Sequence, residues 1–289
     1  MKKLLLIIAL LLGLSPVSSM AEDGASLALR FQHEVDRRLD VPRQDQARYG
    51  NLLEAALARA GVPILSSQYL VMVDRNPYVQ AIFVYWADAQ ASSERFHFIG
   101  ASPASTGKPG QFDHFITPLG VFAHTLNNKD YRAEGTFNAY GFRSYGRRGM
   151  RVFDFGWAQG ERGWGSGGLS QLRLQMHTTD PDYLEQHLGS AMSKGCIRIP
   201  ETLITFIDRY GLLDTYYERA LANGKKLWMI HPDRTPTPWS GRYLVIVDSG
   251  STERPAWSPE PATIVFPPAQ PGDYWLSPST GPIKPASWF

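Results

Sequence analysis

The pattern of apolar residues divides the chain into a helical first part and a longer part rich in strands. Two apolar stripes with helical spacing come first. They are Leu27, Phe31, Val35 and Leu39, followed by Leu53, Ala56, Leu57 and Ala60. Pro42 separates the stripes, and Gly61 ends the second. The pattern predicts a pair of helices within residues 22–65 that packs on the following domain. A helical appendage that binds substrate or a partner is the alternative.

From Gln68 the pattern changes to that of β-strands. Five runs are rich in β-branched and aromatic residues or alternate between apolar and polar positions. They are QYLVMV (68–73), YVQAIFVYW (78–86), RFHFIGAS (95–102), LGVFAHT (119–125) and QLRLQMH (171–177). The turn residues DRNP after the first run predict a hairpin. In the last run Leu172, Leu174 and Met176 share one face, so His177 ends that strand on the opposite face.

Residues 127–168 interrupt the strands with a stretch that is rich in glycine, arginine and aromatic residues and lacks clear periodicity. A loop-rich insertion of this length is typical of a lid or a binding wall, and plain irregular surface is the alternative. Turn and capping signals then predict three helices and a closing strand. These are a short helix from Asp180-Pro181 through His187, a helix from Pro200 to Gly211, a helix over 212–222, and the strand KLWMIH (226–231).

The N-terminus has the build of a secretory signal peptide: two lysines, an apolar run from Leu4 to Leu14, then Ser19-Met20-Ala21. The apolar run is too short to span a bilayer easily, so we expect cleavage after Ala21 and no stable membrane insertion. Removing Lys2 and Lys3 leaves equal numbers of basic and acidic side chains. This balance implies neither nucleic acid nor an anionic membrane surface as a partner.

The remaining composition is that of a globular protein, since 43% of the 289 residues are hydrophobic and 19% are charged. The C-terminal part contains one strand-like run, RYLVIV, and then many prolines mixed with aromatic residues, which predicts an extended arm that packs partly on the domain. Four parts are expected: a signal peptide (1–21), a helical segment (22–65), a main domain (66–231) and a C-terminal extension (232–289).

Cys196 is the only cysteine of the chain, and a secreted protein rarely keeps one unpaired thiol without a use for it. It lies in the loop SAMSKGCIR, downstream of His177 at the predicted strand end. This is the pattern of a cysteine nucleophile with an imidazole base. Thiol acyl transfer also needs donors for the developing oxyanion.

The residues around Cys196 can supply the remaining groups. The backbone N–H groups of the Lys194-Gly195-Cys196 turn are candidate oxyanion donors, because glycine lets the backbone approach a reacting carbonyl. Lys194 and Arg198 would lower the pKa of the thiol and can hold a substrate carboxylate, with ordinary surface bases as the alternative. The predicted site comprises Cys196, His177, Gly195, Arg198, Lys194, Ser193 and Thr178.

Two other chemistries fit the sequence less well. Cys196 and the histidines His114, His124, His177 and His187 could in principle assemble a zinc site, but no close ligand pair has zinc spacing, and HExxH and CxxC are absent. A serine triad of the hydrolase type is disfavoured because GxSxG does not occur. We therefore expect neither a metal nor an organic cofactor.

These residues resemble the signature of the L,D-transpeptidase catalytic domain, also called the YkuD fold. That family carries a histidine, a spacer, and then Ser-His-Gly-Cys followed by an apolar residue and often arginine. The matching pieces are His177 and the segment from Ser193 to Arg198. Ser105-Thr106-Gly107 and TPLGVF (117–122) are similar to two further landmarks in the same order. The resemblance covers roughly residues 66–231, and one position departs from it: Lys194 replaces the signature histidine, and a charged ammonium accepts no proton.

The resemblance implies an α+β protein with a mainly β catalytic domain that acts in the periplasm on the stem peptides of peptidoglycan. Cys196 would attack the bond after the third stem residue and release D-alanine, leaving a thioester. An amine on another stem, or on a surface protein that becomes attached to the wall, would resolve the thioester.

Two alternatives use the same resemblance. The first is hydrolysis of the same peptides by Cys196 and His177, as in an L,D-carboxypeptidase or an amidase, because water and an amine differ only in which of them attacks the thioester. The second is a non-catalytic wall-binding module, against which the presence of both residues argues.

Overall fold

The computed structural model describes residues 17–138 and 140–258, so most of the predicted signal peptide lies outside the described residues. The described chain is a mixed α and β structure in which strands predominate. Its helices are α1 (Val17–Glu34), α2 (Arg43–Arg59), α3 (Glu201–Arg209) and α4 (Thr215–Ala222), with one 3₁₀ turn, η1 (Glu185–His187). Among these described helices, none is both long and apolar enough to cross a membrane.

Five strands form a sheet that we call sheet A, in the order β3-β2-β1-β10-β5. They are β1 (Gln68–Asp74), β2 (Ala81–Ala87), β3 (Phe96–Pro103), β5 (Gly120–Ala123) and β10 (Tyr243–Val247). β1 and β2 form the hairpin that the DRNP turn predicts, and β3 continues it antiparallel to β2. β10 is the RYLVIV run, and it lies parallel to β1 in the interior of the sheet.

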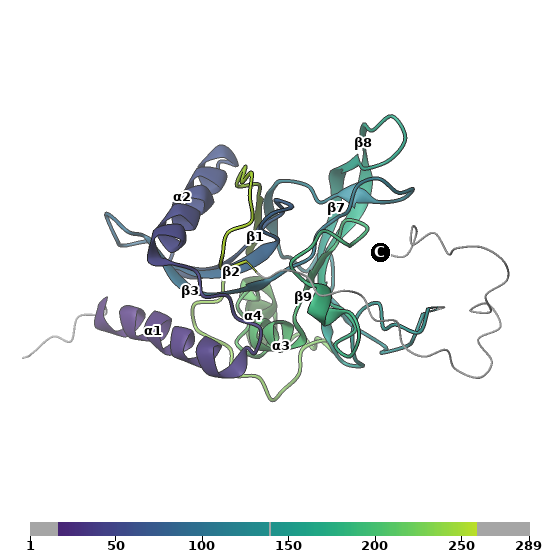
Figure 1. The fold of residues 1–289 in the computed structure, drawn as a ribbon. Helices are drawn as coiled ribbons and strands as arrows, with labels where there is room; N and C mark the ends of the chain where they lie inside the picture. Colours follow the sequence, from purple (N-terminus) through teal and green to yellow (C-terminus); the bar gives the residue numbers. More distant parts are fainter. Residues whose placement is uncertain (1–16, 139, 259–289) are drawn as a thin grey trace, which may run out of the picture.

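Sheet A is buried on both faces, which explains why its strands are continuous apolar runs. Every residue of β1, β2 and β10 is buried. One face packs against α2, and the other faces a core shared with α1, α3 and the second sheet. Figure 1 shows α1 and α2 on opposite sides of this sheet.

The N-terminal helices therefore pack on the domain, as predicted, but on opposite faces of sheet A. Their apolar stripes are mostly buried. Two details differ from the prediction. Val35 and Leu39 are buried but lie beyond the end of α1 at Glu34, and Ala60 is the exposed C-cap of α2.

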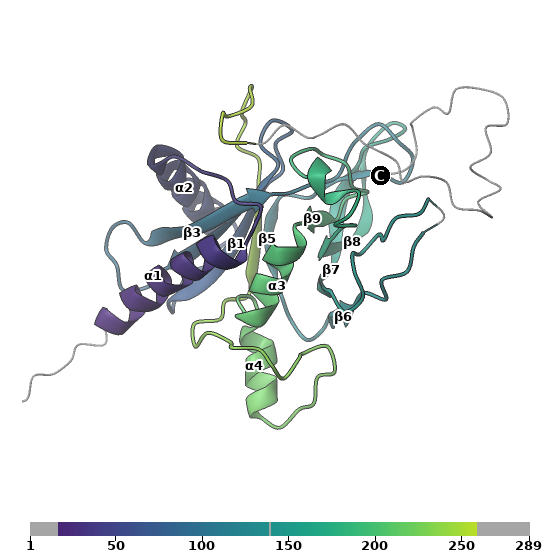
Figure 2. The same ribbon diagram turned by 60° about the horizontal axis from the view of Figure 1, so that its bottom comes forward.

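The second sheet, sheet B, has the strand order β4-β7-β8-β9. Its strands are β4 (Phe115–Ile116), β7 (Arg151–Arg162), β8 (Leu169–Thr178) and β9 (Ile197–Ile199), and β6 (Tyr131–Arg132) pairs with the start of β7. β8 is the predicted QLRLQMH strand. Figure 2 shows sheet B beside α3, with α4 continuing away from it.

The insertion 127–168 is less irregular than the sequence indicates, because β7 is the longest strand of the described chain. A β-bulge between Asp154 and Trp157 hides the alternation, since it shifts the register against β8. Gly156 sits in this bulge with a φ of 85°, a left-handed conformation that favours glycine. Beyond the bulge the side chains alternate between buried and exposed positions.

Two local predictions were wrong. The KLWMIH segment forms no strand, because the carbonyl of its Met229 is bound by Arg132 rather than by a neighbouring strand. The helix predicted to start at Asp180 shrinks to η1, because the backbone N–H groups of Leu184 and Glu185 both bind the Asp180 carbonyl and close a tight turn. The helices after Pro200 and within 212–222 are confirmed as α3 and α4.

A buried ionic network joins the two sheets to α4. Arg151, at the start of β7, donates to Asp130 (2.7 Å) and makes two bonds of 2.7 Å to Asp214, the N-cap residue of α4. His124, directly after β5, lies 2.8 Å from Asp130 through Nε2 and 2.9 Å from the Leu213 carbonyl through Nδ1. A carbonyl and an ionised carboxylate only accept hydrogen bonds, so both ring nitrogens carry protons and His124 is a cation.

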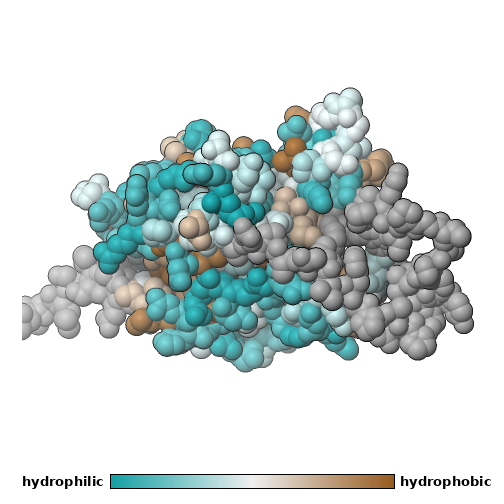
Figure 3. All heavy atoms as spheres, in the orientation of Figure 1, coloured by the Kyte–Doolittle hydropathy of each residue, from teal (hydrophilic) through white to brown (hydrophobic). Residues whose placement is uncertain are grey.

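The outer surface is largely hydrophilic. On the face drawn in Figure 3, hydrophobic residues gather in separate small areas rather than in one continuous patch. Large apolar side chains that are individually exposed include Leu65, Phe112, Trp157, Leu169 and Trp228.

Candidate active site

The register of β8 and β9 brings the predicted nucleophile and base to the same face of sheet B. These strands run parallel, with His177 opposite Arg198 and Met176 opposite Ile197. Met176 and Ile197 point into the core between the sheets. Because side chains alternate, His177, Arg198 and Cys196 lie on the opposite, outer face. Diagonal neighbours on one face of a sheet are roughly 7 Å apart, within the reach of a ring side chain.

The cysteine loop is held by the hydroxyl of Ser193. Ser193 Oγ donates to the carbonyl of Cys196 (2.5 Å) and accepts the backbone N–H of Gly195 (3.0 Å). Gly195 adopts a φ of 126°, which a residue with a side chain rarely does, so the loop needs glycine here. Ser193 is buried and thus acts on the loop from within.

The two upstream landmark segments close on this loop from either side. The backbone of Ser193 donates to the Thr106 carbonyl (2.9 Å), and its carbonyl accepts from Lys108 (2.9 Å). The Thr117 hydroxyl donates to the Gly195 carbonyl (2.8 Å) and accepts the N–H of Gly107 (2.8 Å). Three segments far apart in sequence therefore fix the backbone around Cys196.

His177 is oriented by its neighbour in the chain. Nδ1 lies 2.6 Å from the carbonyl of Thr178, which can only accept, so Nδ1 carries the proton and Nε2 keeps its lone pair. Within the described residues, Nε2 makes no hydrogen bond. The ring is therefore in the tautomer of a general base. Thr178 contributes its carbonyl, whereas its buried hydroxyl donates to the Thr179 carbonyl (3.1 Å).

Cys196 is partly buried, and its Sγ donates to the Arg173 carbonyl at 3.8 Å. No hydrogen bond between Sγ and the His177 ring occurs among the described residues. Proton transfer from the thiol therefore requires Sγ to exchange the Arg173 carbonyl for the imidazole.

Both reacting groups are neutral near pH 7. Burial raises the pKa of the Cys196 thiol above its usual value, and the charge of Arg198 offsets only part of this rise. This reverses the expected lowering of the thiol pKa. Burial, together with the charge of Arg198, lowers the pKa of His177 to about 3. The site thus holds a thiol and an imidazole rather than a preformed ion pair.

Arg198 is a cation without a counterion at the site. Its Nε is buried without a hydrogen-bond partner, and its guanidinium forms no ion pair with any residue of the described ranges. Burial lowers the pKa of the group, but an arginine stays charged in a protein. A buried charge of this kind is costly unless an anion pairs with it. Arg198 is therefore a candidate site for an anionic ligand.

Lys194 and Gly195 contribute differently from the prediction. The ammonium of Lys194 is more than half exposed and pairs with Asp113 at 3.2 Å, on the surface of the loop. The N–H of Gly195 is taken by Ser193 Oγ. The backbone N–H groups of Lys194 and Cys196 have no acceptor among the described residues, so these two remain candidates for oxyanion donors.

An aromatic residue that the sequence pattern did not indicate covers the predicted base. The Tyr145 ring lies 4.5 Å from the His177 ring, centroid to centroid. Its hydroxyl and that of Tyr131 reach Gln175 Oε1 at 3.5 and 3.4 Å. Alternation along β8 could have found Gln175, two residues before His177 on the same face. No signal pointed to Tyr145, because it lies in the insertion without periodicity.

Residues 140–148 form what we call the covering segment. It is fastened to the end of sheet B through Arg143, whose backbone N–H donates to the Asp180 carboxylate at 2.9 Å and whose guanidinium pairs with it at 3.4 Å. Because Tyr145 lies over His177, this half of the insertion forms a wall of the site. The other half is β7.

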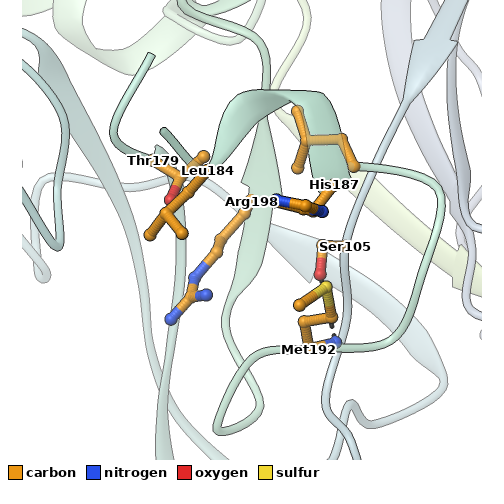
Figure 4. A pocket seen from close by; sticks show the side chains of 7 residues that line it. Ser105, Thr179, Leu184, His187, Met192 and Arg198 are labelled. Atoms are coloured by element: carbon orange, nitrogen blue, oxygen red, sulfur yellow. Dashed lines mark hydrogen bonds between the residues drawn. The ribbon is translucent and has the colours of Figure 1, made fainter. Parts of the chain in front are cut away.

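A small pocket beside Arg198 adjoins the site. Figure 4 shows that Arg198 extends from β9 with its guanidinium directed away from Met192 and His187, while Thr179 and Leu184 lie beside its stem. The backbone of Met192 donates to Ser105 Oγ at 3.1 Å, which ties the cysteine loop to one wall of this pocket.

Two of the other histidines named as candidate metal ligands make hydrogen bonds of their own. His124 belongs to the buried ionic network, and His114 binds the Lys108 carbonyl through Nδ1 at 3.2 Å. Within residues 17–138 and 140–258, no group of three or more His, Cys, Asp or Glu side chains is placed to hold a metal ion.

No protein-family model and no curated protein matches this chain.

Proposed function

We propose that the chain is a periplasmic cysteine acyltransferase of the L,D-transpeptidase type, with a YkuD-like catalytic domain, that acts on peptidoglycan stem peptides. One observation carries the proposal: Cys196, an imidazole with a free Nε2 and the uncompensated Arg198 share the outer face of sheet B. A nucleophile, a base and an anion-binding group are what the cleavage of a carboxylate-bearing peptide requires.

The acylation step follows from these groups. The terminal carboxylate of the stem peptide pairs with Arg198. His177 Nε2 takes the thiol proton as Sγ attacks the carbonyl carbon of the third stem residue. The N–H groups of Lys194 and Cys196 stabilise the oxyanion. The C–N bond then breaks, His177 returns the proton to the leaving amine, and D-alanine departs from a Cys196 thioester.

The second step reverses the roles. An acceptor amine, on another stem peptide or on a protein that becomes wall-attached, gives its proton to His177 and attacks the thioester. An amide forms as the C–S bond of the thioester breaks, and His177 returns the proton to Cys196 Sγ. Neither step needs a metal or an organic cofactor.

The experiment is incubation of the purified protein with tetrapeptide muropeptides, followed by mass spectrometry of the products. Cross-linked dimers, absent with Cys196→Ala, are the expected result. Shortened monomers without dimers would mean that the same site hydrolyses the peptide and does not transfer it. If no product forms and a carbapenem leaves the thiol unmodified, the protein is not a cysteine enzyme of this type and a wall-binding role takes its place.

A further inference from the structure

The outer face of sheet B continues beyond Cys196 as an open strip of side chains. The covering segment shields His177, whereas the part of β7 and β8 on the other side of Cys196 is exposed. The exposed or partly exposed side chains on this face, which we call the outer strip, are Trp157, Gln159, Glu161, Leu169, Gln171 and Arg173. The strip and the reacting thiol therefore lie on one continuous surface.

Trp157 is the main feature of the strip. Its side chain is 67% exposed, although tryptophan is usually well buried. The bulge at Gly156 turns it outward, and Arg173 on β8 lies opposite it. A side chain at Gly156 would meet the Asn128 amide at 2.5 Å, so the bulge packs closely against Asn128. An indole held outward by the backbone is a preformed platform.

Arg173 links this platform to the nucleophile. Its carbonyl accepts the Cys196 thiol, and its guanidinium carbon lies 5.6 Å from the centre of the Trp157 ring. Its Nε pairs with the Asp154 carboxylate at 2.9 Å, which neutralises its charge. Beside the indole the strip offers the amide groups of Gln159 and Gln171 as donors and acceptors, and Glu161, farther along β7, is its one carboxylate.

We propose that the outer strip binds the sugar rings of the glycan strand that carries the stem peptide. This inference rests on the proposed function, because it concerns the substrate of the same site. An uncharged N-acetylated sugar presents an apolar ring face that packs on an indole, and hydroxyl and acetamido groups that bond to amide and guanidinium side chains. The stem peptide then runs from the strip toward Cys196 and Arg198.

The binding test uses Cys196→Ala protein, so that no turnover occurs, with peptide-free glycan strands and free tetrapeptide as separate probes. Trp157→Ala is expected to weaken glycan binding at least tenfold in calorimetry, and Trp157→Phe, which keeps an aromatic face, to weaken it less. Trp228→Ala is the matched control, because Trp228 is 70% exposed on the segment after α4, away from the strip. It should bind like the parent.

Equal glycan binding by the Trp157→Ala and Trp228→Ala proteins would overturn the inference. The inference would also be overturned if Trp157→Ala weakened binding of the free tetrapeptide alone, because the strip would then bind peptide. A kinetic arm separates this inference from the proposed function. Wild-type protein should have a lower KM for disaccharide-tetrapeptide than for free tetrapeptide, and Trp157→Ala should narrow that difference. Turnover without any such difference would retain the function and reject the glycan site, whereas glycan binding without turnover would do the reverse.

Discussion

At the scale of single residues, the site is defined by the neutral forms of Cys196 and His177. Burial disfavours the charged form of both groups, so the resting protein holds a thiol and an imidazole. Arg198 is the opposite case, because it keeps its charge without a counterion among the described residues. A buried cation without a counterion favours the binding of an anion, as the proposed pairing with a substrate carboxylate requires.

The pKa of His177 leads to a pH prediction. A histidine of ordinary pKa, about 6.5, would be protonated below that value and would lose activity as a base. With a pKa of about 3, His177 stays neutral, so kcat/KM should be flat between about pH 5 and pH 8. The measurement is the pH profile of kcat/KM with a stem peptide. An inflection near pH 6.5 that disappears in a His177 variant would show that the pKa of His177 is not lowered in the folded protein.

Arg198 and Lys194 form a matched pair of cations for a second prediction. Arg198→Gln removes the proposed partner of the substrate carboxylate, an interaction that contributes about 1.5–3 kcal/mol, so KM should rise roughly 10- to 150-fold. Lys194→Ala removes only an exposed ammonium paired with Asp113 and should change KM little. Steady-state kinetics on both variants decides the matter. If the Lys194 variant shows the larger rise in KM, Lys194 holds the carboxylate.

At the scale of elements, the strands were predictable where one simple pattern governed them. QLRLQMH alternates, and it forms β8 with His177 on the outer face as expected. β7 was missed because the bulge at Gly156 breaks its alternation, and no local signal in the sequence marks such a register shift. KLWMIH is apolar enough for a strand, yet Arg132 occupies the carbonyl that a partner strand would need.

The residues of the site also differ in how far the sequence alone could predict them. Cys196, His177 and Arg198 could be named from their residue types and spacing, because thiol chemistry restricts the choices. The Tyr145 cover and the hydroxyl of Ser193 at the centre of its loop depend on tertiary contacts. The direction of the thiol pKa was also mistaken from sequence, because burial is a property of the folded chain and outweighs the nearby arginine.

At the scale of the whole molecule, the network around Arg151 holds sheet B against sheet A and α4. Burial alone would lower the pKa of His124, but the charge of Asp130 and its hydrogen bond outweigh burial, so the pKa is raised. A group whose pKa is raised on folding stabilises the fold fully below its unfolded pKa, about 6.5 for histidine. That stabilisation is lost as the pH rises through the pKa of the folded state.

His124→Asn should therefore lower the free energy of unfolding by about 3–5 kcal/mol at pH 6, since it leaves a buried carboxylate short of a partner. The difference in the free energy of unfolding between variant and wild type should narrow as the pH rises through the raised pKa of His124. Denaturant unfolding of both proteins across that range is the measurement. A difference in the free energy of unfolding that is constant with pH would mean that His124 is neutral in the folded protein.

The central proposal is that the sulfur of Cys196 carries the acyl group between donor and acceptor. The most direct measurement is the mass of the intact protein, trapped by acid during turnover of a tetrapeptide stem, with peptide mapping of the adduct. The account predicts an added mass equal to the stem peptide without its terminal D-alanine, located on Cys196, and strongly reduced in the His177→Ala protein. Product formation with no adduct on Cys196, or an adduct on another residue, would contradict it.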